Sequence, residues 1–197
     1  MKILLASHNM NKFSEIKQML NKTNIELQNL NNINKDVPDE NGKSYKQNAH
    51  IKALNAAKII KWKYDCLADD SGLSINALDG SPGIYSSRWA PLKNYHYAFS
   101  KIKKKFESLG KDMNGKNAKF VCALFFLKKN KEEFYYEGTL EGKLVFPPRG
   151  TLGFGYDPIF VPDGENKTLA ELGKMKKNQI SHRKKAIENF LKDQFEK

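Results

Sequence analysis

Cysteine and long apolar runs are both scarce in this chain. The only cysteines, Cys66 and Cys122, are far apart in the sequence, which excludes a zinc ribbon and a disulfide framework. Each stands in an apolar stretch, so we expect two buried thiols of a reducing compartment. No apolar stretch approaches the roughly 18 residues of a transmembrane helix, and residues 1–12 lack the apolar core of a signal peptide. We therefore expect a cytoplasmic protein without a membrane partner.

Arginine is also scarce, although the chain is strongly basic. Lysine and arginine total 34 against 22 acidic residues, for a net charge of +12, and only Arg88, Arg149 and Arg183 are arginine. A composition rich in lysine and asparagine can come from an AT-rich genome, so we expect most of these lysines to form a solvated surface. Attraction of a polyanion, either nucleic acid or a small triphosphate, is the alternative.

The apolar pattern indicates an α/β protein with a mixed sheet. Hydrophobic residues make up 40% of the 197 residues, enough for a substantial core, and no internal repeat or low-complexity linker interrupts the chain. Residues 2–7 are typical of a short buried strand of a parallel sheet, and residues 11–22 of an amphipathic helix. Strands that alternate with helices in this way predict the α/β class.

The later segments continue this pattern. Ser44 is expected to cap a helix over residues 45–62, and residues 65–70 form a short strand that ends in two aspartates. Residues 71–90 contain several glycine and proline breaks and should be rich in loops. Residues 118–146 are β-branched and aromatic, which predicts two or three antiparallel strands with a turn near residues 129–131. Residues 181–197 form an amphipathic helix.

Four polar clusters stand at the ends of predicted strands and helices, where α/β proteins place ligand sites. The first is residues 7–12, where a helix N-terminus suits a phosphate, although Asn9 can equally be a simple helix cap. The second is Asp39 with Glu40, which fits either an exposed acidic loop or a metal site.

The third cluster is the adjacent pair Asp69 and Asp70. A turn is one interpretation, because Asp, Ser and Gly are common turn formers. A magnesium site is the other, because Mg²⁺ takes one or two carboxylates together with substrate phosphates. Adjacent residues of a strand point to opposite faces, so one aspartate should face a ligand while the other supports it.

The fourth cluster combines aromatic and basic residues. Phe154 and Tyr156 suit either base stacking or core packing, and Lys177 suits either a ligand or a solvated surface. His182 and Arg183 stand at the start of the last helix, next to its expected cap Ser181. Two basic side chains at the positive end of a helix dipole disfavour each other unless an anion binds there.

In this order, the clusters resemble the inosine triphosphate pyrophosphatase family. The matching stretches are ASHNMNKFSEI, NAHIKALNAA, LADDSGLSINALDGSPGIYSSRWA, GFGYDPIF and ISHRKKAI, which span residues 2–189. The resemblance implies a single domain over residues 1–197, with an elongated mixed sheet split into two lobes, helices around it and the active cleft between the lobes.

The resemblance also implies a reaction. Mg²⁺-assisted attack of water between the α- and β-phosphates of ITP, dITP or XTP would release the nucleoside monophosphate and pyrophosphate, and so cleanse the nucleotide pool. The expected partners are the purine nucleoside triphosphate and a second copy in a homodimer, with no nucleic acid.

Carried over residue by residue, the resemblance assigns Asp70 as general base and metal ligand, and Asp39 as a second metal ligand. Asp39 stands where the family usually has an acidic ligand, commonly Glu, so Glu40 is the alternative. His8 stands where small residues are frequent, and a left-handed backbone there would suit it less well than glycine. The residues assigned to the nucleotide are Ser7, His8, Asn9, Met10, Asn11, Lys12, Lys52, Ser71, Phe154, Gly155, Tyr156, Asp157, Lys177, His182 and Arg183.

Two other functions fit parts of the sequence. A nucleic-acid-binding module would use the +12 charge, but it leaves the carboxylates unexplained, since they repel phosphates. A pyrophosphatase for modified pyrimidine triphosphates would keep the chemistry and change the base, which the GFGYDPIF segment disfavours.

Overall fold

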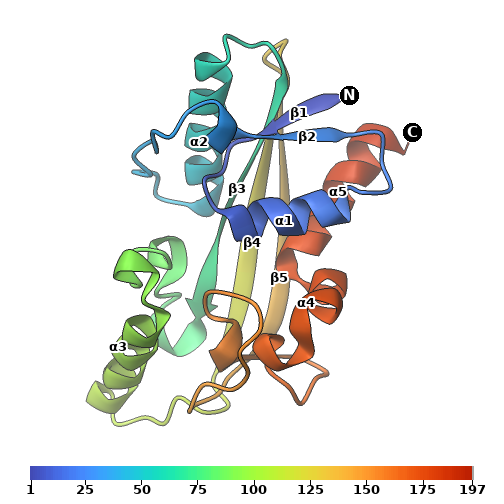
Figure 1. Ribbon diagram of the computed structural model, residues 1–197. Helices are drawn as coiled ribbons and strands as arrows, with labels where there is room; N and C mark the ends of the chain where they lie inside the picture. Colours follow the sequence, from blue (N-terminus) through green and yellow to red (C-terminus); the bar gives the residue numbers. More distant parts are fainter. Residues whose placement is uncertain (197) are drawn as a thin grey trace. The chain divides into compact units, whose positions relative to one another are not determined.

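The computed structural model describes residues 1–196 and shows an α/β protein with a mixed sheet (Figure 1). Within these residues the strands are β1 (Lys2–Leu5), β2 (Glu26–Asn29), β3 (Asp65–Ile75), β4 (Asn117–Leu127), β5 (Glu133–Leu144) and β6 (Phe160–Pro162). The α-helices are α1 (Met10–Met19), α2 (Tyr45–Ile59), α3 (Tyr95–Ser108), α4 (Leu169–Ile180) and α5 (His182–Phe195). The predicted class is confirmed.

The sheet has the strand order β2-β1-β3-β4-β5-β6. β1 runs parallel to both β2 and β3, with Ile3 opposite Asp65 and Leu5 opposite Leu67, whereas β5 and β6 are antiparallel. β4 and β5 are neighbours joined by residues 128–132, a connection too short for a parallel crossover, so they form a hairpin. The expected turn and the mixed character of the sheet are both confirmed.

The chain forms two compact units. Unit 1 comprises Met1–Asp70, Cys122–Gly138 and the chain from Arg183 onward, and unit 2 comprises Ser71–Val121 and Thr139–His182. Three of the four boundaries fall within β3, β4 and β5, so each of these strands contributes residues to both units, and the fourth separates His182 from Arg183 at the start of α5. On β3 the boundary lies directly after the acidic pair.

In unit 1, helices cover both faces of the sheet (Figure 1). Ile3 and Leu5 of β1 pack with α1 and α5, whereas Leu4 packs on the opposite face with the alanines of α2. β4 alternates in the same way, with Leu124 on the α1–α5 face and Phe125 on the α2 face. Burial on both faces explains why these strands are continuous apolar runs.

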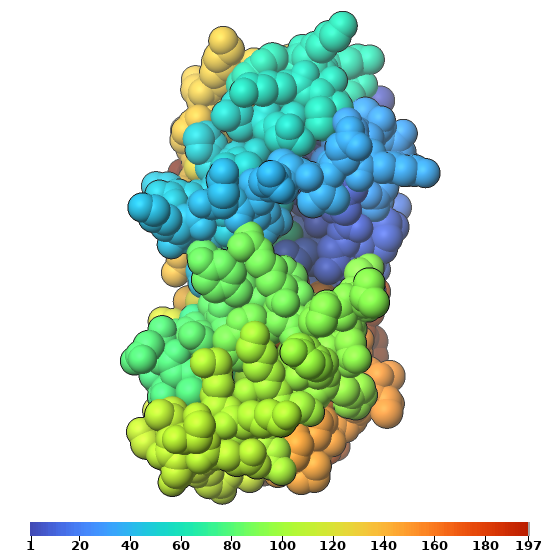
Figure 2. All heavy atoms as spheres, turned by 90° about the vertical axis from the view of Figure 1, so that its left-hand side faces the viewer, coloured from blue at the N-terminus to red at the C-terminus, as the bar shows by residue number. Residues whose placement is uncertain are grey.

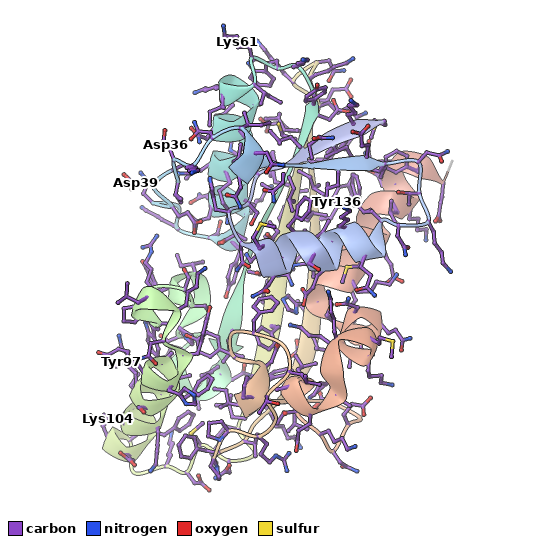
Figure 3. The ribbon with its side chains drawn as sticks, viewed as in Figure 1. Asp36, Asp39, Lys61, Tyr97, Lys104 and Tyr136 are labelled. Carbon is purple, nitrogen blue, oxygen red and sulfur yellow. The ribbon has the colours of Figure 1, made fainter. Side chains whose placement is uncertain are left out.

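The core of unit 2 lies between α3 and its share of the sheet. Phe99, Ile102 and Phe106 of α3 belong to one buried cluster with Phe120 of β4 and Phe160 of β6. The outer side of α3, shown in green in Figure 2, carries the exposed side chains Tyr97 and Lys104, which are labelled in Figure 3. Residues 76–93 form short 3-10 turns, as the glycine and proline breaks predicted.

The predicted end of β3 is wrong, because the strand continues through Asp69 and Asp70 to Ile75. Leu73 and Ile75 are fully buried in the core of unit 2, while Ser71 and Ser74 are partly exposed. This packing holds the segment extended and overrides the turn preference of Asp, Ser and Gly. The turn interpretation of the acidic pair is therefore excluded.

The two cysteines are free, buried thiols, as expected. Burial raises the pKa of Cys66 and of Cys122 to about 12. Over residues 1–196, every helix is too short or too polar to span a bilayer.

Candidate active site

The segment between β1 and α1 is organised by short side chains. Asn9 Oδ1 accepts hydrogen bonds from the backbone N–H groups of Asn11 and Lys12, at 3.0 and 3.3 Å, so Asn9 caps α1. The buried Ser7 accepts the Asn9 N–H through its Oγ at 3.3 Å. The backbone at His8 is not left-handed, and its ring contacts the Asn34 carbonyl at 3.1 Å, so histidine fits this position without strain. Met10 and Asn11 are exposed on the first turn.

Asp69 and Asp70 contact opposite faces of β3, as strand geometry predicts. The Asp69 carboxylate meets Lys12 of α1 and Arg183 of α5. The Asp70 carboxylate meets Lys52 of α2. Because α2 and the α1–α5 pair cover different faces of the sheet in unit 1, the two neighbouring carboxylates form their ion pairs on opposite faces, although the Lys52 charge also attracts Asp69.

The Asp69 network is buried and ionic. Asp69 Oδ2 lies 3.1 Å from Lys12 Nζ, 3.1 Å from Arg183 Nη2 and 3.4 Å from Arg183 Nε. Arg183 also contacts Glu15 of α1 through Nη1. The Asp69 and Arg183 side chains are 0% and 2% exposed, so one guanidinium links two carboxylates away from solvent.

The electrostatics of this network favour the charged forms. Burial raises the pKa of Asp69, but Lys12 and Arg183 lower it by more, so its pKa lies well below the usual range. Burial likewise lowers the pKa of Arg183, while Asp69 and Glu15 raise it above its ordinary value. Removing one member would therefore leave a buried charge without its partner.

The Asp70 network joins α2, β3 and the loop before α2. Lys52 Nζ lies 2.9 Å from Asp70 Oδ1 and 3.2 Å from Glu40 Oε1, so two carboxylates converge on one ammonium. Asp70 Oδ2 accepts a hydrogen bond from Asn48 Nδ2 at 3.2 Å. Burial lowers the pKa of Lys52, but Asp70 and Glu40 raise it by more, and its pKa lies above the ordinary value.

The residues around Lys52 fit a magnesium ion. Mg²⁺ prefers carboxylate oxygens and is commonly held by one or two of them together with substrate phosphates. Glu40 and Asp70 are such a pair, because both already contact the same cation. In the part of the chain that the structure describes, no group of three or more His, Cys, Asp or Glu side chains is placed to hold a metal ion.

The loop before α2 places Glu40, rather than Asp39, beside Asp70. Glu40 is partly buried and pairs with Lys52, whereas Asp39 is exposed and lies at the outer edge of the loop in Figure 3. Figure 2 shows this loop, in lighter blue, on the surface of unit 1 next to α2. The geometry therefore favours Glu40, the alternative to Asp39 that the sequence left open, as the second metal ligand.

In unit 2, Asp157 organises the glycine-rich segment. Its Oδ2 accepts the Phe154 N–H at 2.9 Å and contacts Lys177 Nζ at 2.6 Å. A Cβ atom at Gly153, where φ is +84°, would lie 2.2 Å from the same oxygen, so glycine is required there. Gly155 also has a left-handed backbone, with φ +71°. The predicted segment is therefore a tight turn around one buried carboxylate.

Lys177 is buried rather than solvated. Its side chain is 2% exposed, and its Nζ lies 4.0 Å from the centroid of the partly exposed Phe154 ring. Tyr156 is buried and donates its hydroxyl to the Ser86 carbonyl at 2.8 Å, which supports the packing interpretation for that ring. His182 stacks on Phe120 with ring centroids 4.9 Å apart.

The structure thus sorts the predicted residues into two groups. Unit 1 brings Lys12 and Arg183 to Asp69, and Lys52 to Asp70, with Ser7 and Asn9 on the loop before α1. The group in unit 2 comprises Ser71, Phe154, Gly155, Tyr156, Asp157, Lys177 and His182.

Two residues of these networks were missed from the sequence. Glu15 follows Lys12 by three residues, and Asn48 precedes Lys52 by four, so each shares a helix face with a predicted lysine. That spacing was the signal available. It was insufficient alone, because such neighbours are common on any helix.

Comparison with known proteins gives one family across the chain. The model of the Ham1 family matches residues 3–193. The dITP/XTP pyrophosphatase of Rhodospirillum centenum is 41% identical over 190 residues, which cover 96% of this chain and 92% of that protein.

Solved structures agree with this match. A HAM1 protein from Coxiella burnetii has a TM-score of 0.88 at 35% identity, with 100% of both chains covered. A nucleoside-triphosphatase, named dITP/XTP pyrophosphatase, from Mycobacterium abscessus has a TM-score of 0.74 at 36% identity, covering 97% of this chain and 99% of that one.

Proposed function

The chain belongs to the Ham1 family, and on that premise we propose that it hydrolyses non-standard purine nucleoside triphosphates, such as ITP, dITP and XTP, to the monophosphate and pyrophosphate. The observation that carries the proposal is the convergence of Glu40 and Asp70 on the Lys52 ammonium, at 3.2 and 2.9 Å. Carboxylates and an ammonium at one place are the groups that metal-assisted hydrolysis of a phosphoric anhydride requires.

Asp70 is the general base in this proposal. Its carboxylate is held by Lys52 on one oxygen and by Asn48 on the other, so its orientation is set before a substrate arrives. A carboxylate fixed in this way can orient a water molecule and accept its proton as the water attacks phosphorus. Lys12 and Lys52 supply positive charge, which stabilises the negative charge on the leaving pyrophosphate.

Glu40 and Asp70 are the residues that would hold Mg²⁺. When bound, the ion supplies Lewis-acid stabilisation of the phosphate oxygens and lowers the pKa of a coordinated water. Lys52 contacts both carboxylates, and its raised pKa keeps it cationic at neutral pH. This ammonium can attract the phosphate oxygens of a bound triphosphate.

We assign recognition of the base to unit 2. Phe154 offers a partly exposed ring, and Lys177 beneath it is fixed by Asp157. An aromatic ring on a rigid glycine turn suits stacking with a purine. Donors directed at O6 would discriminate against adenine, because a buried donor without a partner is costly. His182 and backbone N–H groups near Tyr156 are the candidates for these donors.

The proposal is tested with a panel of triphosphates. Purified protein is incubated with ITP, dITP, XTP, ATP and GTP in the presence of Mg²⁺, and pyrophosphate and single phosphate are assayed separately. We expect pyrophosphate, with ITP, dITP and XTP clearly preferred over ATP and GTP. Equal turnover of all five would refute the specificity, and release of single phosphate would refute the assigned bond.

A further inference from the structure

Asn48 is a buried amide that connects the two carboxylate-bearing segments of unit 1. It lies on the first turn of α2 and is 0% exposed. Its Oδ1 accepts the Gly42 N–H at 2.9 Å, and its Nδ2 donates to Asp70 Oδ2 at 3.2 Å. Gly42 follows Glu40 by two residues, so one side chain joins the Glu40 loop to the Asp70 strand.

The chemistry of the two contacts fixes the orientation of this amide. A backbone N–H can only donate, so the atom that faces Gly42 must be the amide oxygen. The other end is then the NH₂ group, which can only donate and which meets a carboxylate oxygen. An aspartate at position 48 would face Asp70 without a donor, and a leucine would satisfy neither contact.

Gly42 shows how closely the loop approaches α2. A Cβ atom at this position would lie 2.6 Å from Asn48 Oδ1 and 2.8 Å from Gln47 Cβ. Both distances are far inside van der Waals contact, so a larger residue would push the loop away from the amide. The contact between the loop and Asn48 therefore depends on residues on both sides.

We infer that Asn48 is a positioning residue, which holds Glu40 and Asp70 at the separation at which both can bind one divalent cation. The inference deepens the proposed function and rests on its assignment of these carboxylates to the metal. Without the amide, the Gly42 N–H and one Asp70 oxygen each lose a partner, and the loop that carries Glu40 loses its link to β3. Asp70 then keeps its ion pair with Lys52.

The test measures binding of Mn²⁺ by electron paramagnetic resonance, in the absence of nucleotide. We expect Asn48→Ala to weaken binding about tenfold, the scale seen when a hydrogen-bond partner that orients a metal-binding carboxylate is removed. Gly42→Ala should weaken Mn²⁺ binding by a similar factor, because its methyl group would push the loop away from the Asn48 amide. The double variant should be no weaker than the more impaired single variant, because both changes break one bridge.

Gln47→Ala is the matched control. Gln47 is an exposed neighbour on the same turn, and its Oε1 accepts the Lys43 N–H at 2.6 Å, so it holds the same loop without reaching β3. This variant should bind Mn²⁺ within about twofold of the wild type. In turnover of ITP, the Mg²⁺ concentration for half-maximal rate should rise in Asn48→Ala, while the KM for nucleotide at saturating Mg²⁺ changes little.

Several results would overturn the inference. These are wild-type Mn²⁺ affinity in Asn48→Ala, an equal loss in Gln47→Ala, additive losses in the double variant, or no Mn²⁺ binding by the wild type. If Asn48→Ala does not fold, Asn48→Ser keeps a small polar group and should show the same loss. If the variants show the expected Mn²⁺ affinities relative to the wild type but the wild type cleaves no nucleotide, the proposed function is refuted and the positioning role is supported.

Discussion

Asp69 and Asp70 are one peptide bond apart, yet their carboxylates contact different helices. Asp69 is bound to Lys12 and Arg183, with no exposed side-chain surface, while Asp70 is bound to Lys52 and 8% exposed. The alternation of a strand turns the pair toward opposite faces. The first carboxylate is therefore suited to holding α1 and α5 on the sheet, and the second to chemistry.

Asp69→Asn tests whether Asp69 holds α1 and α5 on the sheet. The folded pKa of Asp69 lies below its unfolded value of about 3.9, so its stabilisation is fully present above that pH and is lost as pH falls toward the folded pKa. We expect the variant to be less stable by about 3–5 kcal/mol at pH 7, because Lys12 and Arg183 lose a buried partner. The difference in the free energy of unfolding between wild type and variant, measured by urea unfolding from pH 7 to pH 2.5, should shrink below pH 4. A difference independent of pH would contradict the role.

At the scale of helices and strands, the sequence correctly predicted those elements whose type and position follow from the residues within them. The apolar run of β1, the Ser44 cap of α2 and the β4–β5 turn all follow from local residues, and the structure confirms them. The end of β3 was missed, because burial of Leu73 and Ile75 in unit 2 decides it. Local turn preference carries no information about that packing.

The candidate site divides in the same way. Lys12, Lys52 and Asp70 could be named because they stand in stretches that resemble the motifs of the pyrophosphatase family. Glu15 and Asn48 could not, since their roles depend on which side chains the fold brings together. Lys177 resembled a solvated lysine in a charged run, and only its burial beside Asp157 corrects that interpretation.

Asn9 offers a test at the start of α1. Its side chain caps the helix, and the resemblance also places it near phosphate. Asn9→Asp keeps a good cap but adds a negative charge, so we expect an unchanged free energy of unfolding and a KM for ITP that rises about tenfold. Asn9→Ala, as the control, should lose about 1 kcal/mol of stability. An unchanged KM in Asn9→Asp would show that this loop does not meet the phosphates.

At the scale of the whole molecule, the net charge of +12 does not describe the site. The two networks of unit 1 gather the carboxylates of Glu15, Glu40, Asp69 and Asp70 around Lys12, Lys52 and Arg183. These carboxylates suit a divalent cation that arrives with a triphosphate, and they disfavour a nucleic-acid backbone. The homodimer, the cytoplasmic location and the absence of nucleic-acid binding stay predictions.

The most direct test of the central claim compares pyrophosphate release from ITP by the wild type and by Asp70→Asn, at saturating ITP and Mg²⁺. Asparagine keeps the shape of the side chain, and Lys52 retains Glu40 as a partner, so the variant should stay folded. We predict that kcat falls at least ~10²-fold, the scale of lost general base catalysis, with a melting curve close to that of the wild type. A folded Asp70→Asn variant with near-normal kcat would contradict the assignment of Asp70 as the base.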